Sequence, residues 1–272
     1  MNTISYVFTL IFLQPLLNLL VWFYNVLPWQ DLGIAIILLT IVIKLILYPF
    51  TIAQIKQQRA LQEIQPKMDE IRTRLKDKKE EQAKELMALY ATEKVNPAAS
   101  CLPLLIQLPV LIALYRALSL TLSAKSLTLL YAFVATPTII NTKFLGFMDL
   151  TKPSYVLAIL AALVQFIQTK QILKPPAALV KSPPAEVAGS KGAKDESMAT
   201  AMNKQMTYMM PIVTAIIGVS LPAGLTLYWF VMSLLTWLQQ WWIMKKMPPK
   251  ITPQLSPPAG GPVASPPVLP VV

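Results

Sequence analysis

The sequence predicts an all-α integral membrane protein with a five-span helical core, an outer interfacial N-terminal helix and a cytoplasmic helical hairpin. Of its 272 residues, 55% are hydrophobic and 14% are charged, whereas an average soluble domain has about 25% charged residues. Several apolar runs approach the length of about 20 residues that a helix needs to cross a bilayer. Lysines and arginines are concentrated in a few connecting segments, as the positive-inside rule requires of cytoplasmic loops.

Residues 1–30 are expected to form an amphipathic helix on the outer membrane surface. Three polar side chains would form a narrow stripe on an otherwise apolar helix: Gln14, Asn18 and Asn25. Three aromatic residues suit the interfacial aromatic belt: Trp22, Tyr24 and Trp29. Residues 4–27 are also long enough to cross the membrane, so a sixth span remains the alternative.

The five spans are expected in four apolar runs. The first span covers 31–52, the second 101–120 and the third 155–173. Residues 206–244 form one further run of 39 residues. At about 1.5 Å per residue this run is nearly twice the thickness of a hydrocarbon core. It must therefore fold back, and the sequence Leu-Pro-Ala-Gly at 221–224 is the predicted turn between the fourth and fifth spans.

Positive charges set the expected orientation. The segment 51–96 contains ten lysines and arginines, and none precedes Lys44. Residues 53–96 are therefore placed in the cytoplasm, with the N-terminus outside, the loop 121–154 external and the C-terminus inside. The same segment contains eight acidic residues, so its net charge is only +2.

The three cytoplasmic segments have different expected structures. In 53–96, two stretches of helical apolar periodicity flank a polar break at 76–79, which predicts an antiparallel helical hairpin. The segments 174–205 and 245–272 are rich in proline and alanine and lack an apolar period. They are expected to be a flexible loop and a disordered tail.

The composition argues against common catalytic sites. The chain has no histidine and a single cysteine, Cys101, which leaves no His-based acid–base chemistry, Cys/His metal site or internal disulfide. No glycine-rich nucleotide-binding motif is found. The sequence therefore predicts no catalytic residue, metal or cofactor. Because the last charge is Lys250, no basic RNA-binding tail is expected either.

Lys44 lies inside the first span, where an ammonium group costs roughly 2.5 to 3.5 kcal/mol to insert. One interpretation is snorkelling toward the cytoplasmic boundary near Phe50, about 9 Å away by helix rise. The other is a wet cavity open to the cytoplasm, since no acid in a predicted span can pair with this cation. Such a cation would attract a carboxylate on another molecule. Four polar residues would line this cavity or form helix–helix hydrogen bonds: Thr40, Gln107, Gln165 and Gln168.

Arg116 is a second cation within a predicted span. The alternating serine, threonine and leucine residues that follow it suggest an outer boundary of the membrane. Snorkelling to that boundary is the expected explanation of its position.

A family resemblance begins at residues 94–118, KVNPAASCLPLLIQLPVLIALYRAL. This stretch closely resembles the second-span signature of the YidC-type membrane protein insertases, the YidC, oxidase-assembly and albino family. The similarity extends in the family's order over nearly all of 12–244. It is carried by FLQPLLNLLVWFYNVL, YPFT, LQEIQPKMDEIR, FLGFMDLTKPS and LPAGLTLYWFV.

The resemblance implies a protein that inserts and helps to fold membrane proteins without hydrolysing nucleotide. It implies a hydrophilic groove, closed outside and open to cytoplasm and lipid, in which one cation attracts an acidic stretch of the client. Lys44 stands where the family usually has arginine. Tyr228 and Trp229 stand at two aromatic positions of the fifth span, where client contact and simple packing are equally good explanations.

The resemblance also implies partners and a location. The expected partners are nascent membrane proteins, lipid, the Sec translocon, and the ribosome through the hairpin and the loop 174–204. The expected location is the bacterial plasma (inner) membrane, and the expected form is a short one without the family's large external domain. Three rival functions remain: a small-anion channel or transporter that uses Lys44, a structural anchor for the hairpin and, least favoured, an intramembrane protease.

Overall fold

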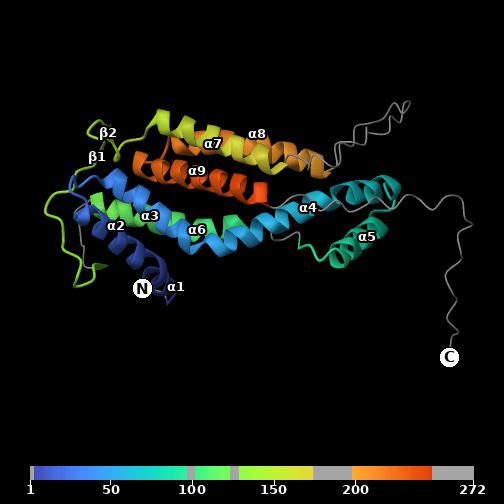
Figure 1. Ribbon diagram of the computed structural model, residues 1–272, viewed down its shortest axis with the longest axis horizontal. Coiled ribbons are helices and arrows are strands. Elements are labelled where there is room, and N and C mark those ends of the chain that lie inside the picture. Colours follow the sequence, from blue (N-terminus) through green and yellow to red (C-terminus); the bar gives the residue numbers. More distant parts are fainter. Residues whose placement is uncertain (1–2, 97–101, 123–128, 174–197, 247–272) are drawn as a thin grey trace, which may run out of the picture.

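The computed structural model describes residues 3–96, 102–122, 129–173 and 198–246. Within them the chain is predominantly helical, as expected, and forms an elongated bundle from one end of which a helical hairpin projects (Figure 1). The helices are α1 (Thr3–Phe8), the π-helical segment η1 (Thr9–Leu13), α2 (Gln14–Val26), α3 (Leu32–Ile46), α4 (Tyr48–Arg74), α5 (Lys79–Thr92), α6 (Leu102–Leu122), α7 (Tyr155–Leu173), α8 (Met198–Gly218) and α9 (Ala223–Lys246).

The first three helical segments form one rod, Thr3–Val26, which packs against α3 and α6. In the described parts of the chain, this rod is the helix long and apolar enough to cross a membrane alone. α3 and α4 pass the same test only as a pair that bends by 64°. The shorter apolar helices are Leu105–Thr121, Tyr155–Gln171 and Thr207–Gly218. The rod is therefore long enough to be the sixth span that the sequence left as an alternative. The count of five spans stays a prediction.

The main core lies between α2, α3, α6, α7 and α9 and consists of aliphatic side chains with two buried tyrosines. Small residues allow the helices to approach closely. The position of a Cβ on Gly224 of α9 would be 3.4 Å from Ile36 Cδ1 on α3, and on Gly218 of α8 it would be 3.0 Å from Ala158 Cβ on α7. α9 therefore packs directly on α3, and α7 packs on both α8 and α9.

The turn between α8 and α9 lies slightly earlier than the predicted 221–224. α8 ends at Gly218 and α9 begins at Ala223, so Pro222 precedes the first helical residue. The first N–H groups of a helix have no partner within it, and here they are bonded to the loop 129–154, which is called the external loop for its predicted side of the membrane. Ala223 N donates to Lys152 O at 2.8 Å, and Gly224 N donates to Leu150 O at 3.0 Å.

α3 and α4 are separate helices, although the sequence placed 31–52 in one span. Asp31 caps α3, because its Oδ1 accepts hydrogen bonds from the N–H groups of Gly33 at 2.7 Å and Ile34 at 3.1 Å. α3 ends at Ile46, and α4 begins at Tyr48 with Pro49 in its first turn. Proline is compatible with that position because the first N–H groups of a helix need no intrahelical partner. Residues 48–52 thus belong to α4 and not to α3.

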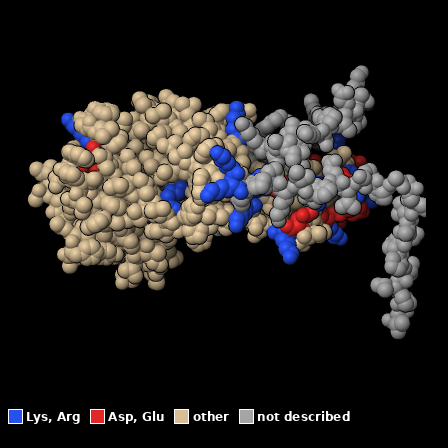
Figure 2. Space-filling view, in the orientation of Figure 1, with Lys and Arg blue, Asp and Glu red and all other residues tan. Residues whose placement is uncertain are grey.

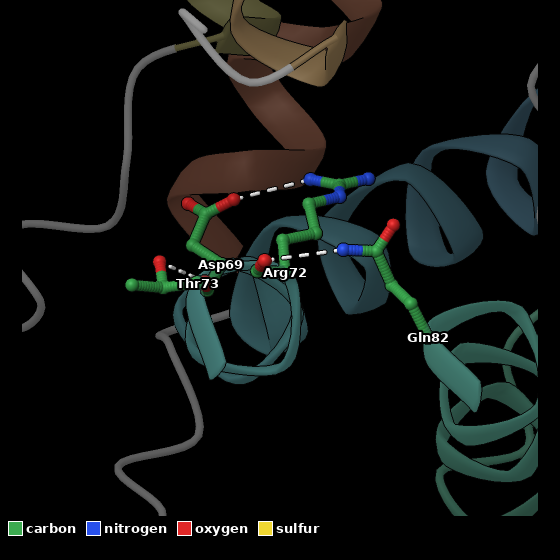
Figure 3. Close-up of polar contacts among 4 residues, drawn as sticks. All are labelled: Asp69, Arg72, Thr73 and Gln82. Carbon is green, nitrogen blue, oxygen red and sulfur yellow. Dashed lines mark hydrogen bonds and ion pairs between the residues drawn. The ribbon is translucent and has the colours of Figure 1, made fainter. Parts of the chain in front are cut away.

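α4 and α5 pack side by side around a small core of Ile64, Met68 and Val95. Ion pairs join Arg74 to Glu85 near the turn and Lys67 to Glu93 far from it, so the two helices run antiparallel. Figure 3 shows the polar contacts at the turn. Arg72 Nη1 contacts Asp69 Oδ1 at 3.1 Å, Thr73 Oγ1 donates to Asp69 O at 2.8 Å, and Gln82 Nε2 donates to Arg72 O at 3.1 Å.

The external loop contains a short antiparallel hairpin of β1 (Lys143–Phe144) and β2 (Met148–Asp149), where the sequence predicted no strand. Its turn has Leu145 at φ 51° and Gly146 at φ 81°. Positive φ values match the twist of a tight hairpin turn, and Gly146 was the one local signal for it. Next to the hairpin, hydrogen bonds from the hydroxyl and N–H of Thr151 hold the pKa of Asp149 below its usual value.

Candidate functional site

Lys44, on α3, is half-buried and faces α9. Its Nζ donates a long hydrogen bond of 3.5 Å to Gln239 Oε1. Among the ion pairs of the described residues, none includes Lys44. The site therefore has a partly buried positive charge whose only described polar partner is neutral.

The Lys44 side chain extends toward the end of the bundle where α4 and α5 lie. Ile36 of α3 packs at the level of Gly224 of α9. At about 1.5 Å per residue, Lys44 lies about 12 Å beyond that level on α3, and Gln239 lies about 22 Å beyond it on α9. The two Cα positions thus differ by about 10 Å along the bundle. An extended Lys44 side chain directed toward the hairpin end spans much of this difference. This direction agrees with the snorkelling interpretation, while the amide contact and partial burial agree with a polar cavity.

Gln239 is a site residue that the sequence interpretation missed, and Gln240 follows it on α9. Gln239 Nε2 and Gln240 Oε1 are buried without a hydrogen-bond partner in the described part of the chain, and Gln240 is only 4% exposed. Buried polar groups are usually satisfied, so both atoms retain unused hydrogen-bonding capacity, and that of Gln239 lies beside Lys44. The available signal was two adjacent amides inside the apolar run 206–244, of the same kind that drew attention to Gln107.

Thr40 lies one turn before Lys44 on the same face of α3 and is fully buried. Its Oγ1 donates to Ile36 O at 2.6 Å. The hydroxyl proton is therefore used within the helix, and only the oxygen lone pairs remain for another group.

Gln107 and Tyr228 form a second polar contact, between α6 and α9. Gln107 Nε2 donates to the Tyr228 hydroxyl at 2.8 Å, and Tyr228 is fully buried. Tyr228 precedes Gln239 by 11 residues, or about 16 Å along α9. Trp229, beside it, is half-buried. This pair lies at a different level of the bundle from Lys44.

Gln165 contacts neither Lys44 nor Gln107. Its Oε1 accepts a hydrogen bond of 2.5 Å from Thr214 Oγ1, which joins α7 to α8. Gln168 is half-buried on α7 and has no side-chain hydrogen bond within the described residues. The structure thus brings the predicted polar residues into separate interhelical contacts and not into one contact set around Lys44.

Arg116 of α6 is exposed, and its guanidinium lies 5.4 Å from the centre of the Phe8 ring on α1. Phe8 thus provides an aromatic partner for this cation, in addition to the expected snorkelling. The contact links α6 to the N-terminal rod at a position away from Gln239.

The polar stripe of the N-terminal helix binds the external loop. Asn18 Nδ2 donates to Leu129 O at 2.9 Å, and Asn18 Oδ1 accepts from Tyr131 N at 2.6 Å. Asn25 Nδ2 donates to Ala135 O at 2.6 Å. Part of the stripe that suggested a surface helix is therefore directed at the protein's own backbone.

Tyr24 extends this attachment, and its predicted place in an aromatic belt is wrong. It is 2% exposed, its hydroxyl donates to Ile139 O at 3.2 Å, and the same oxygen accepts from Asn141 N at 2.7 Å. Asp31 Oδ2 accepts from Leu145 N at 2.7 Å. Buried side chains of α2 and the α3 cap thus fix the loop over the end of the bundle opposite the hairpin (Figure 1).

Comparisons with a family profile and with known proteins identify the same family. The profile of the family described as 60Kd inner membrane protein matches residues 22–250. A membrane protein insertase YidC of Geobacter metallireducens is 32% identical over 234 residues, which is 86% of this chain and 37% of that protein. The YidC of Lawsonia intracellularis is 30% identical over 90% of this chain and 41% of its own length.

A shorter relative is matched over most of its length. The membrane protein insertase YidC of Fusobacterium nucleatum is 33% identical over 216 residues, which is 79% of this chain and 87% of that protein. The chain thus spans about two fifths of the length of the Geobacter and Lawsonia proteins and most of the Fusobacterium one.

Proposed function

Because this chain belongs to the 60Kd inner membrane protein family, whose members are membrane protein insertases and not catalytic enzymes, we propose that it inserts proteins into the bacterial plasma membrane. Short hydrophilic client segments pass along a groove beside Lys44. The client's apolar helix then moves sideways into lipid, and the burial of its apolar surface drives the process.

The observation that carries this proposal is Lys44, a partly buried cation with a neutral partner. An opposite charge at about 4 Å gains about 4 kcal/mol at an effective dielectric constant near 20. A client carboxylate can gain part of this energy because no described carboxylate of the protein occupies the position. The attraction is modest enough for the client to leave again.

Gln239 gives the proposed site a second donor. Its Nε2 is buried without an acceptor, while its Oε1 contacts Lys44 Nζ. A client carboxylate placed between Lys44 Nζ and Gln239 Nε2 would accept hydrogen bonds from both. Hydrogen bonds to a charged group are stronger than those between neutral groups.

The attached external loop supports a groove that opens toward the cytoplasm. Asn18, Tyr24 and Asp31 hold that loop at one end of the bundle, whereas Lys44 extends toward the other. We place the N-terminus outside and the C-terminus inside. The ribosome would contact the hairpin and the loop 174–204, of which 174–197 lie outside the described residues, and the Sec translocon would assist some clients.

The decisive experiment is insertion of a purified single-span client with an acidic N-terminal tail into vesicles that contain only this protein. Protease protection of the tail measures insertion, and protein-free vesicles give the background. We expect protection above that background. Anion conductance or uptake without client insertion would reject the proposal in favour of a channel that uses Lys44.

A further inference from the structure

Cations from three helices meet at one level of the bundle, at the end where the hairpin begins. Gln171 Nε2 on α7 lies 3.8 Å from Met244 Sδ on α9, and Arg59 Nη1 on α4 donates to Met244 O at 3.4 Å. These contacts align the ends of α7 and α9 with the first half of α4. The basic rim that results consists of Arg59, Lys170, Lys245 and Lys246.

The three lysines of the basic rim have aromatic partners and, among the described residues, no acidic ones. Their Nζ atoms lie over rings on the same helix, at 4.5 Å for Lys170 and Phe166, 5.5 Å for Lys245 and Trp241, and 3.7 Å for Lys246 and Trp242. The two tryptophans are 53% and 45% exposed. None of these lysines forms an ion pair with the described acids.

The hairpin beyond the basic rim is different, because its cations are largely neutralised. Its ion pairs are Lys67–Glu93, Arg72–Asp69, Arg74–Glu85 and Lys78–Glu81. Figure 2 shows the same contrast: blue side chains without red neighbours lie where the tan body ends, and blue and red are mixed beyond them. Of the basic-rim residues, Arg59 forms an ion pair with a described acid, with 3.9 Å between its Nε and Glu63 Oε1.

We propose that the basic rim binds the phosphate headgroup of an anionic phospholipid of the inner leaflet. The lysines supply the opposite charge, and Trp241 and Trp242 supply the amphipathic surface that suits the boundary between headgroups and acyl chains. The ends of α7 and α9 also place the cations at helix C-termini, where positive charge is stable. The inference rests on the membrane placement proposed above but not on client binding by Lys44.

The test compares two double variants that remove the same charge. Lys245→Gln with Lys246→Gln alters the basic rim, and Lys67→Gln with Lys78→Gln alters the hairpin. The full-length protein is reconstituted in phosphatidylcholine bilayers containing spin-labelled phosphatidylglycerol or spin-labelled phosphatidylcholine, and the motionally restricted fraction of each label is measured.

We expect wild type and the hairpin variant to prefer phosphatidylglycerol by about twofold or more, because each lysine near the surface attracts anionic lipid. The rim variant should lose most of this preference, 0.5 M salt should weaken it in wild type, and Lys245→Arg with Lys246→Arg should retain it. Equal preference in the rim and hairpin variants would overturn the proposal. So would a rim variant that keeps its lipid preference but loses ribosome pelleting, since that would indicate RNA phosphate as the ligand.

Client insertion is measured on the same samples. A Lys44→Glu variant that loses insertion but keeps the lipid preference would show that the two sites are separate. Absence of insertion in every sample would reject the proposed function and leave the lipid measurement valid.

Discussion

Lys44 and Gln239 contact each other although 195 residues separate them in the chain. Their meeting places a positive charge beside an unused amide N–H of Gln239. At this scale the charge of a single side chain can be tested without changing the fold, because Lys44 is only partly buried.

Reversal of the charge at Lys44 should abolish the attraction for acidic clients. We expect Lys44→Arg to retain insertion and Lys44→Glu to reduce it by about tenfold or more, since a loss of only about 1.4 kcal/mol changes a rate tenfold. Vesicle insertion of a client with an acidic tail measures the effect, and a neutral tail is the control. Equal insertion by the two variants would refute the role of the charge.

A carboxylate at position 239 should also weaken the attraction of Lys44 for acidic clients, because it would neutralise the cation from within the protein. Gln239→Glu would pair with Lys44 and occupy the cation, so insertion of the acidic-tailed client should fall several-fold. Gln168→Glu, which adds the same charge on α7, is the matched control and should change insertion less. Identical rates for both variants would show that Gln239 does not belong to the site.

Gly33 has no room for a side chain, because a Cβ there would collide with the ring of Phe144. We expect Gly33→Ala to lower the free energy of unfolding by about 1 to 3 kcal/mol through overpacking. Thermal unfolding in detergent measures the loss. Phe144→Ala in the Gly33→Ala background removes the clash and should recover part of the stability; if Gly33→Ala unfolds like wild type, the predicted clash is absent.

At the scale of elements, the N-terminal helix and the external loop behave as one unit. Asn18, Tyr24 and Asn25 bind backbone groups of the loop, and Asp31 links the start of α3 to the turn of the β-hairpin. Several backbone groups of the loop are thus bonded to side chains of other elements, in addition to the backbone hydrogen bonds within the loop and to the start of α9.

Removal of the Asn18 amide should loosen this loop. Asn18→Leu leaves Tyr131 N and Leu129 O without partners, which costs about 1 to 3 kcal/mol for a buried polar group. Hydrogen exchange of residues 129–141 should therefore become faster. Gln14→Leu, on the same stripe but without a side-chain bond to the loop in the described structure, is the control. Unchanged exchange in Asn18→Leu would mean that other contacts hold the loop.

At the scale of the whole molecule, the bundle has two different ends. The external loop covers one, and the charged hairpin with the basic rim extends from the other (Figures 1 and 2). The rod Thr3–Val26 is long enough to cross a membrane, yet its polar side chains bind the loop. The side of the membrane on which this rod begins can therefore be tested directly.

A cysteine at position 3 reports the side on which the rod begins. In a Cys101→Ser background, Thr3→Cys should react with a membrane-impermeant maleimide added from outside to intact cells. A cysteine at Lys84→Cys in the hairpin should react only after the membrane is opened. Labelling of position 3 from the cytoplasm alone would show that the rod crosses the membrane as a sixth span.

Local sequence features determined the family, the helical class and several boundaries. The family resemblance is confirmed by the match over 22–250, and the predicted third run coincides with α7 at Tyr155–Leu173. Such features succeed because an apolar run, a proline or a polar break acts on the backbone within a few residues. The helix ends at Arg74 and Lys79 follow from the charged break between them in the same way.

Only the tertiary structure decided which polar groups meet. Gln107 was as good a candidate as Gln165 for a place beside Lys44, but each is bonded elsewhere, and the unpredicted Gln239 has that place. The asparagines of α2 are bonded to a loop more than 100 residues away. Periodicity shows which face of a helix is polar, but the packing of distant helices determines what that face touches, because these contacts join residues with no local relation in sequence.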